Sequence, residues 1–372
     1  MTTISRIINK TARYIKRIGD YRNGQLSYDT LFFNVTSRCN SDCVFCDARS
    51  LDHSRDMSYE RKMLLISEAH DMGIAKIYFS GGEPFVMEEI WLLIDHALKI
   101  GMEVSVVSNG LLIPSFNGEQ FDLLKKTASI DISLESHVPN VHNRLRGGDD
   151  FFEKTVQGIR LLRQQGILVN INTVISTANY RELADFIEWV RELDADMVNF
   201  QPIHIWSNYY DGRPLSKPEY ALDLASLADF DKSIDQALAK EKSTGQKTNL
   251  KRIRPWIKSY FLAQIKNDRR IWMKDIVPDF KCVEIFTKLF LHSDGSVLPC
   301  AMLSPLENIG NKTLAEAVTS LDKTKDMIRR GLFPEECYKC SCQMMLNYNF
   351  SIMSNPLANF KNALTLALEY LR

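Results

Sequence analysis

Short apolar runs alternate with longer amphipathic stretches between about residue 30 and residue 205. The runs are rich in β-branched and aromatic residues, which is typical of buried strands. The stretches between them show helical periodicity, and several end in glycine, the usual helix stop, as in AHDMGI and LLRQQGI. The pattern predicts strands at 30–36, 76–82, 103–110, 129–136, 168–176 and 196–203, with helices near 58–72, 87–100, 119–127, 151–165 and 179–193.

Strands that alternate with helices form parallel sheets through right-handed crossovers. Six such units predict an α/β fold of the open, partial (β/α)6 barrel type. Polar segments follow the first four predicted strands, in the order SRCNSDCVFC, GGEP, SNG and SLES. Because chemistry in such folds gathers at the carboxyl ends of the strands, we expect a site on this rim of the barrel.

The alternation stops after FQPIHIWSNYYDGRPLSKPEY, and the rest of the chain has a different character. Residues 217–275 are charged and helical in pattern, and a second cysteine-bearing unit begins near residue 282. We expect five segments: a basic amphipathic segment at 1–28, a barrel core at 29–216, a helical bridging region at 217–281, a small unit of hairpin and helix at 282–345, and an amphipathic helix at 346–372.

Charge and hydropathy narrow the class of protein. Lys plus Arg and Asp plus Glu both number 46 in a chain of 372 residues, and this balance argues against a nucleic-acid scaffold. No apolar run approaches the roughly 18 residues of a membrane span. The N-terminus lacks the apolar core of a secretory signal. We therefore expect a cytoplasmic protein, in which thiols stay reduced.

All eight cysteines fall in two regions, a clustering that favours metal over disulfides in a cytoplasmic chain. Cys39, Cys43 and Cys46 follow the first predicted strand with the spacing C-x3-C-x2-C. A structural zinc site normally closes with four protein ligands, and a thioredoxin-type pair would leave Cys39 unexplained. In a [4Fe–4S] cluster, three thiolates leave one iron open.

This segment, with Phe45 before the third cysteine, resembles the signature of radical S-adenosylmethionine (SAM) enzymes. The resemblance covers about residues 30–205. It implies that SAM chelates the open iron through its amino and carboxylate groups. It also implies reductive cleavage of SAM to methionine and a 5′-deoxyadenosyl radical, which abstracts hydrogen from carbon. The electron would come from a donor such as flavodoxin or ferredoxin.

Other segments are similar to the SAM-binding positions of that family. GGEP would receive the SAM ammonium, with Glu83 or nearby carbonyls as acceptors and two glycines that allow a close backbone approach. Arg146, in HNRLRGG, would face the SAM carboxylate. Glu135 and Asn143 stand where related enzymes more often carry Asp. The residues implied to contact SAM are Phe45, Ser80, Gly81, Gly82, Glu83, Pro84, Ser108, Asn109, Ser133, Glu135, Arg146 and Asn172, although for Asn172 a role in the core is equally compatible.

The second cysteine group contains a predicted hairpin, KLFLHSDGSVLPC, and a predicted helix before ECYKCSC. It looks like the auxiliary-cluster extension of radical SAM enzymes known as SPASM, in its shortened Twitch form. The resemblance implies one auxiliary [4Fe–4S] cluster, and a zinc site with the same ligands is the alternative. The expected ligands are Cys282, Cys300, Cys337 and Cys340, with Cys342 either spare or in place of Cys340.

The substrate is the least explicit part of the sequence. His204 and Tyr209, at the expected barrel mouth, are candidates for proton transfer or substrate contact. A small molecule, a sugar or a lipid-linked compound that is oxidised, dehydrated or epimerised is favoured. A peptide or protein maturase is the alternative, less favoured because only 38 residues precede Cys39. A non-catalytic zinc scaffold is the alternative of another class. The basic N-terminal segment has two interpretations: a helix packed on its own protein, which is the commoner case, or a helix that contacts the inner face of a membrane.

Overall fold

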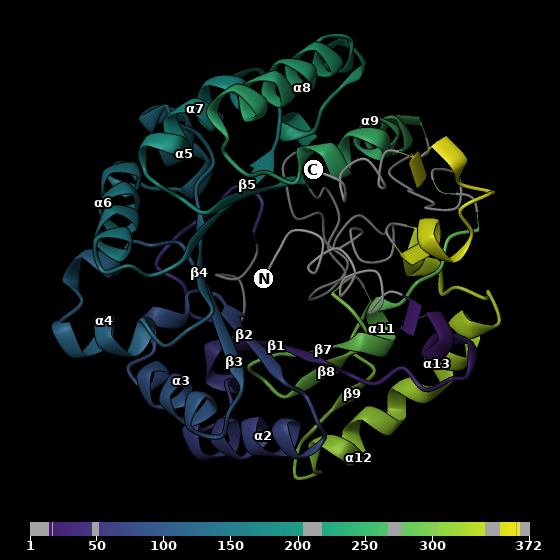
Figure 1. Cartoon of the computed structure of the whole chain (residues 1–372). Helices are drawn as coiled ribbons and strands as arrows, with labels where there is room; N and C mark the ends of the chain where they lie inside the picture. Colours follow the sequence, from purple (N-terminus) through teal and green to yellow (C-terminus); the bar gives the residue numbers. More distant parts are fainter. Residues whose placement is uncertain are drawn as a thin grey trace.

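One mixed sheet of nine strands organises the computed structural model (Figure 1). Its strand order is β6-β5-β4-β3-β2-β1-β7-β8-β9. The structure describes residues 15–16, 18–46, 52–203, 218–266, 277, 279–301, 303–338, 350–361 and 363–364. The six predicted barrel strands are confirmed as β1 (Thr30–Thr36), β2 (Lys76–Gly81), β3 (Glu103–Ser108), β4 (Ser129–Ser133), β5 (Val169–Ile175) and β6 (Met197–Pro202), each parallel to its neighbours.

Helices cover the outer face of this curved sheet (Figure 1). The five predicted helices are confirmed as α2 (Tyr59–Asp71), α3 (Ile90–Lys99), α4 (Gly118–Leu124), α6 (Phe151–Gln164) and α7 (Leu183–Glu192). Their ends follow local chemistry, since Ser58 caps α2 and Asn117 with Gln120 forms a capping box at α4. Short 3₁₀ turns lie at His53–Arg55, Pro84–Val86, Ile113–Ser115, Tyr180–Glu182, Pro218–Tyr220, Thr319–Leu321 and Glu335–Tyr338.

One helix, α5 (Pro139–Arg146), was not predicted. Its eight residues carry few apolar side chains, so the stretch reads as a polar loop. Pro139 starts it at a position where a missing N–H costs nothing, and Gly147 ends it in the left-handed conformation.

Side chains alternate across each barrel strand, and this alternation separates the core from the barrel interior. In β5, Ile171 and Thr173 are buried on one face, whereas Asn170 and Asn172 on the other face stay partly exposed. The buried face packs against the surrounding helices and forms the main apolar core. The opposite face lines the interior of the barrel, where polar residues are retained.

The bridging region is helical as predicted, with α8 (Leu224–Thr244) and α9 (Leu250–Lys266). The segment between these helices covers the open edge of β6. Asn249 accepts from the Phe200 amide at 2.8 Å and donates to the Phe200 carbonyl at 2.9 Å. An uncovered strand edge is a site of unwanted pairing, so this contact protects the end of the sheet.

The C-terminal unit contains the predicted hairpin, formed by β7 (Lys288–Leu291) and β8 (Ser296–Leu298). Its other elements are α11 (Glu284–Thr287), β9 (Glu307–Asn308), α12 (Leu314–Val318) and α13 (Asp322–Arg329).

The hairpin belongs to the same sheet as the barrel strands, because β7 pairs in parallel with β1. The Phe32 ring stacks on Tyr78 at 4.8 Å and on Phe290 at 5.0 Å, which joins three neighbouring strands.

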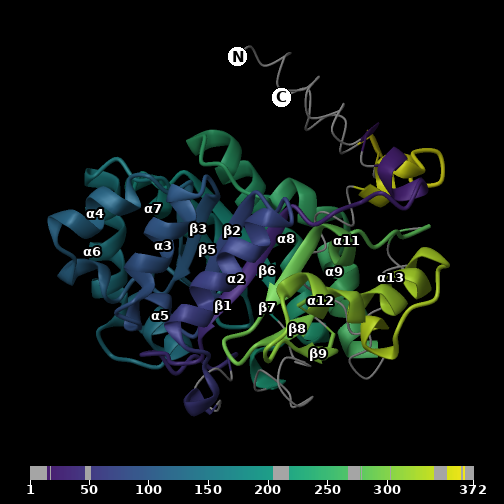
Figure 2. The ribbon, with the colours of Figure 1, turned by 90° about the horizontal axis from the view of Figure 1, so that it is seen from below.

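The described residues near the two chain ends lie together at one side of the molecule (Figure 2). Tyr21 packs on Phe286 and Phe350, with ring centroids 5.6 Å and 5.4 Å away. Within the described ranges, none of the helices combines the length and the apolar character needed to cross a bilayer.

Candidate functional site

The loop that carries the first three cysteines leaves the carboxyl end of β1, at the rim where the site was expected. Cys39 and Cys43 are half-buried and Cys46 is exposed, and none of them forms a disulfide. The Ser41 amide donates to Cys39 Sγ at 3.4 Å, and Arg146 Nη1 lies 3.6 Å from Cys43 Sγ. Nitrogen donors near two sulfurs suit thiolate ligands, because they stabilise negative charge on sulfur.

Burial raises the pKa of two of the three thiols, those of Cys39 and Cys43. It raises the pKa of Cys39 to about 11, against the opposing hydrogen bond from Ser41. It also raises the pKa of Cys43, against the charge of Arg146. A bound metal would reverse this balance, because a coordinating thiol is deprotonated outright. The donor set therefore fits an iron–sulfur cluster. Across the described ranges, however, no three His, Cys, Asp or Glu side chains are arranged as a metal site, so cluster ligation stays a prediction.

Two glycines pack closely against the backbone of the cysteine loop. A Cβ on Gly82 would lie 2.1 Å from the Arg38 carbonyl oxygen, and one on Gly147 would lie 2.4 Å from the Asp42 carbonyl oxygen. Gly147 also has a φ of +80°, which favours glycine. We expected the glycines of GGEP to let the backbone approach a ligand. In the structure Gly82 approaches the backbone of the cysteine loop, and no ligand is needed to explain its small size.

Glu83 is buried at the end of β2, and its carboxylate is fully engaged within the protein. It accepts from the Asn109 amide at 2.7 Å, the Ser108 hydroxyl at 2.9 Å and the Phe85 amide at 3.1 Å. Burial raises its pKa to about 7, although these donors pull the pKa down. Glu83 therefore ties the end of β2 to the end of β3, and Pro84 next to it begins a 3₁₀ turn.

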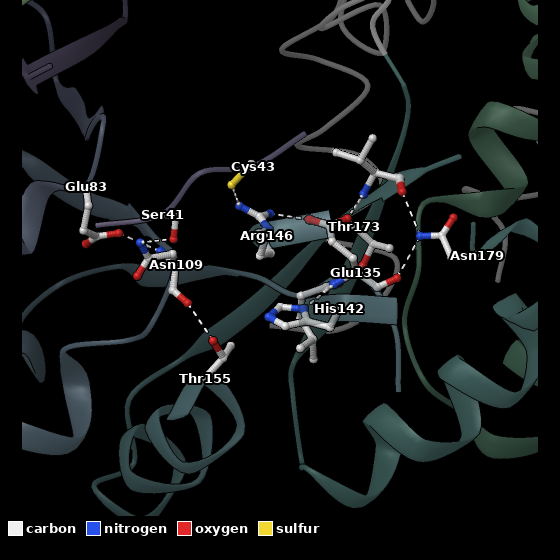
Figure 3. Close-up of polar contacts among 12 residues, drawn as sticks. Ser41, Cys43, Glu83, Asn109, Glu135, His142, Arg146, Thr155, Thr173 and Asn179 are labelled. Atoms are coloured by element: carbon white, nitrogen blue, oxygen red, sulfur yellow. Dashed lines mark hydrogen bonds and ion pairs between the residues drawn. The ribbon is translucent and has the colours of Figure 1, made fainter. Parts of the chain in front are cut away.

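Asn109 connects the end of β3 to the cysteine loop (Figure 3). Its side-chain nitrogen, Nδ2, donates to the Ser41 hydroxyl at 3.1 Å. The same Nδ2 donates to Asn40 Oδ1 at 2.7 Å. The hydroxyl of Thr155, on α6, donates to the Asn109 carbonyl at 2.9 Å. The contact from Asn109 to Asn40 and Ser41 was not anticipated, because those two residues show no motif of their own.

Arg146 and Glu135 form a buried ion pair beside the loop (Figure 3). The other Glu135 oxygen accepts from the Val174 amide at 2.7 Å, so the pair links β4, α5 and β5. The Arg146 guanidinium also lies 5.4 Å from the centre of the Phe45 ring. Arg146 thus touches Cys43, Phe45 and Glu135, which brings together three of the residues implied to form the site.

The end of α5 also holds the loop through its backbone. The Asp42 amide donates to the Arg146 carbonyl at 3.2 Å, and the Val44 amide donates to the Leu145 carbonyl at 3.0 Å. These carbonyls are among those that a helix end leaves without internal partners. On the same helix, burial and the nearby Arg146 charge lower the pKa of His142 to about 3. His142 is therefore neutral, and its Nδ1 accepts from the Glu135 amide at 3.2 Å.

The barrel interior next to this rim is polar. Ser80, Ser133 and Asn172 lie on interior-facing strand positions, with Ser133 and Asn172 in register. Asn199 donates to Asn172 Oδ1 at 3.3 Å.

Asp131 lies one interior position before Ser133, and the sequence motifs did not single it out. Asp131 Oδ1 accepts from the Ser129 hydroxyl at 2.9 Å and from the Asn170 amide at 2.8 Å. Strand alternation was the one signal that could have identified Asp131, Asn170 and Asn199.

Four predicted site residues, His204, Tyr209, Cys340 and Cys342, lie outside the described residues. Cys282 packs against the apolar cluster of Ile285, Phe286 and Ile328. Cys300 packs against the cluster of Phe290, Leu298 and Ala301. Cys337 lies in the turn at Glu335–Tyr338. These three cysteines of the second set therefore lie in the C-terminal unit.

Two family models match the chain. The model described as the Radical SAM superfamily matches residues 33–190, and SPASM, described as an iron–sulfur cluster-binding domain, matches residues 282–341.

Among curated proteins, GTP 3′,8-cyclase of Petrotoga mobilis is 29% identical over 200 residues, covering 50% of this chain and 60% of the relative. The antilisterial bacteriocin subtilosin biosynthesis protein AlbA of Bacillus subtilis is 29% identical over 169 residues, covering 45% and 38%. The matches thus span about 40 to 60% of these relatives.

Solved structures share the fold at low sequence identity. SuiB of Streptococcus suis bound to S-adenosylmethionine has a TM-score of 0.62 at 16% identity, covering 90% of this chain and 76% of that chain. The structure titled native anSMEcpe with bound AdoMet has a TM-score of 0.61 at 18% identity, covering 91% and 98%. Both likenesses extend through the barrel and the C-terminal unit.

Proposed function

Because the chain is an enzyme of the radical SAM superfamily with a SPASM domain, we propose that it cleaves SAM reductively beside Cys39, Cys43 and Cys46 and abstracts hydrogen from a polar substrate in the barrel interior. Its cofactors are SAM, a SAM-binding iron–sulfur cluster and an auxiliary cluster. A bound [4Fe–4S] cluster would supply the one electron that cleaves SAM to methionine and the 5′-deoxyadenosyl radical.

The observation that carries this proposal is the convergence of separate rim segments on the cysteine loop. Gly82 and Gly147 pack against its backbone, Asn109 holds Asn40 and Ser41, and Arg146 reaches Cys43. These contacts come from the ends of β2 and β3 and from α5. A zinc scaffold would need the cysteines but would not need this arrangement of rim segments around them.

We assign the chain's own residues distinct tasks toward SAM. Arg146 would bind the SAM carboxylate with its planar guanidinium, held in place by Glu135. Glu83 would act as a positioning residue that joins β2 to β3, since its oxygens already accept three hydrogen bonds. Backbone carbonyls of GGEP are then the remaining acceptors for the SAM ammonium.

The barrel interior favours a polar substrate. Asp131, Asn170, Asn172 and Asn199 line its β4–β6 wall with carboxylate and amide groups. We therefore favour a small molecule, a sugar or the polar head of a lipid-linked compound. His204 and Tyr209 remain our candidates for proton transfer, and a flavodoxin or ferredoxin remains our candidate electron donor.

Modification of a peptide is the second candidate, and the comparisons support it. AlbA is named for biosynthesis of a bacteriocin, and the titles of related structures record SuiB with the precursor peptide SuiA and anSMEcpe with the Cp18Cys peptide. A substrate labelled with deuterium at the reacting carbon separates the two classes, because only the true substrate passes its label into 5′-deoxyadenosine.

The auxiliary cluster would be bound by Cys282, Cys300, Cys337 and Cys340. The match to the iron–sulfur model ends at residue 341, which favours Cys340 over Cys342 as the fourth ligand. Changing Cys342 to Ala should then leave the iron content unchanged, whereas changing Cys340 to Ala should remove about four irons per chain. The opposite result would assign Cys342 as the ligand.

The test of the proposed function is SAM cleavage under anaerobic conditions. The reduced enzyme should convert SAM to methionine and 5′-deoxyadenosine, which chromatography measures. Changing Cys39, Cys43 and Cys46 together to Ala should abolish this conversion, whereas Cys342→Ala should retain it. Unchanged 5′-deoxyadenosine formation in the triple variant would refute the assignment of the site.

A further inference from the structure

Four large apolar side chains near the two ends of the chain are strongly exposed. They are Ile15 at 63%, Leu357 at 86%, Phe360 at 69% and Leu364 at 53%, and we refer to them as the terminal apolar surface. Single exposed leucines are ordinary on a protein, but several large apolar residues on one surface mark an interaction site.

Leu357, Phe360 and Leu364 follow helical spacing, so they lie on one face of the C-terminal segment. Backbone hydrogen bonds support that helical path, because the Asn359 amide donates to the Asn355 carbonyl at 3.2 Å and the Ala363 amide donates to the Asn359 carbonyl at 2.8 Å. The helical backbone therefore places these three exposed side chains on the same face of the segment.

The described residues of the N-terminal and C-terminal segments lie side by side (Figure 2). A pocket of about 310 Å³ lies between them, lined by Ile18, Tyr21 and Arg22 on one side and by Phe350 and Asn355 on the other. Contacts of Tyr21 with Phe350 and Phe286 anchor both segments to the C-terminal unit.

The N-terminal sequence that contains Ile15 is rich in positive charge. Residues 1–22 contain six Lys and Arg against one Asp, a surplus of five positive charges. The whole chain has no net charge, so residues 23–372 carry a surplus of five negative charges. The Lys16 side chain, next to Ile15, is 78% exposed and forms an ion pair with Asp20 at 2.9 Å.

We propose that the terminal apolar surface binds the surface of an anionic bilayer. Exposed leucine and phenylalanine beside a basic segment match the two requirements of an interfacial anchor, which are apolar insertion and attraction to anionic lipid. A second copy of the chain fits less well, because it would bring two strongly basic segments together. The acidic remainder of the molecule would be repelled by the same bilayer, so the charge asymmetry orients the protein.

Bilayer contact does not depend on the proposed radical chemistry. If that chemistry also holds, the anchor would bring the polar barrel interior to lipid-linked substrates. Failure of one proposal therefore leaves the other intact, since lipid binding and 5′-deoxyadenosine formation are measured separately.

Vesicle flotation of the anaerobically purified holoprotein tests the inference. The protein should float with phosphatidylcholine vesicles that contain about 30% phosphatidylserine, and should bind vesicles of phosphatidylcholine alone at least about tenfold more weakly. Raising the salt from about 0.05 M to about 0.5 M should weaken binding, because the attraction to lipid is screened.

Two matched variants assign the binding to named residues. Leu357→Glu with Phe360→Glu should weaken flotation by at least about tenfold, because two inserted apolar groups are lost and two negative charges are added. The control is Leu64→Glu with Leu92→Glu, which changes two leucines of 50% and 54% exposure on α2 and α3. It adds the same charge and should float like the unchanged protein.

Three results would overturn the proposal. The first is no flotation of the unchanged protein with anionic vesicles, and the second is equal loss of binding in the control variant. The third is a dimer in light scattering that the Leu357→Glu, Phe360→Glu variant converts to a monomer without any lipid binding, which would assign the surface to a second copy of the chain.

Discussion

At the scale of single residues, Gly82 packs so tightly on the cysteine loop that no side chain fits at its position. Changing Gly82 to Ala would place Cβ 2.1 Å from the Arg38 carbonyl oxygen, so the loop must move. We expect reconstituted iron to fall by about half, since one of two cubanes is lost. Iron analysis measures this. Gly118→Ala is the control, because no atom lies within 4 Å of its Cβ, and iron loss in that variant would contradict the explanation.

The buried pair of Arg146 and Glu135 should be strongly coupled. Removing one partner leaves the other charge buried and alone, which typically costs about 3–5 kcal/mol. We expect Arg146→Gln and Glu135→Gln each to lower the free energy of unfolding. In the double variant, the loss of this free energy should be much smaller than the sum of the losses in the two single variants. Chemical denaturation without SAM measures this cycle. Additive losses would show that the pair is not energetically linked.

His142 should make the protein sensitive to mild acid. Its folded pKa, about 3, lies below the unfolded value of about 6.5, so the unfolded state takes up the proton first. Its stabilising contribution is full above about pH 6.5 and falls by about 1.4 kcal/mol per pH unit below that value. Chemical denaturation at about pH 7 and at about pH 5.5 measures this effect. Between these two pH values, the free energy of unfolding of His142→Asn should fall by about 1.4 kcal/mol less than that of the unchanged protein.

A histidine on the surface provides the control for that pH dependence. The His70 side chain is 45% exposed, and His70→Asn should keep the acid sensitivity of the unchanged protein. If His142→Asn and His70→Asn behave alike, the buried His142 is not the source of the effect.

The sequence singled out the cysteine loop and Arg146, because each lies in a motif with its own spacing, and the structure places Arg146 against that loop. It was less informative about Glu83 and Asn109, whose partners come from other loops. Asn109 meets Asn40 and Ser41 across 69 and 68 positions of the chain, and no local pattern encodes that meeting. Asp131 was missed for a similar reason, since its partner Asn170 lies on the neighbouring strand.

At the scale of elements, apolar periodicity was sufficient for the six barrel strands but not for α5 or for the pairing of β1 with β7. Helix α5 is short and mostly polar, so its sequence carries no apolar periodicity from which a helix could be predicted. Only the structure shows the helix and its packing against the cysteine loop. Strands β1 and β7 lie more than 250 positions apart, as Leu31 and Leu289 show. The hairpin could be predicted from its turn, but its place in the barrel sheet could not.

This shared sheet should make the barrel and the C-terminal unit unfold together. Leu291 is fully buried on β7 and pairs with Phe33 on β1, so Leu291→Ala should cost about 2–5 kcal/mol. We expect circular dichroism and cluster absorbance to shift in one common transition. The exposed Leu306, changed to Ala, should alter stability by about 0.5 kcal/mol or less. Two separate transitions in the Leu291→Ala variant would contradict a single cooperative sheet.

At the scale of the whole molecule, cysteines from two distant parts of the chain lie next to strands of one continuous sheet. The first follows β1, and Cys282 and Cys300 of the second flank the β7–β8 hairpin that pairs beside it. The central claim is that each set holds its own [4Fe–4S] cluster, with the first left open for SAM.

Anaerobic iron and acid-labile sulfide analysis tests this claim most directly. We predict about eight irons and eight sulfides per chain in the unchanged protein, and about four of each when Cys39, Cys43 and Cys46 are all changed to Ala. Stoichiometric zinc in a colourless protein, or an iron content that the triple change leaves unaltered, would contradict the account.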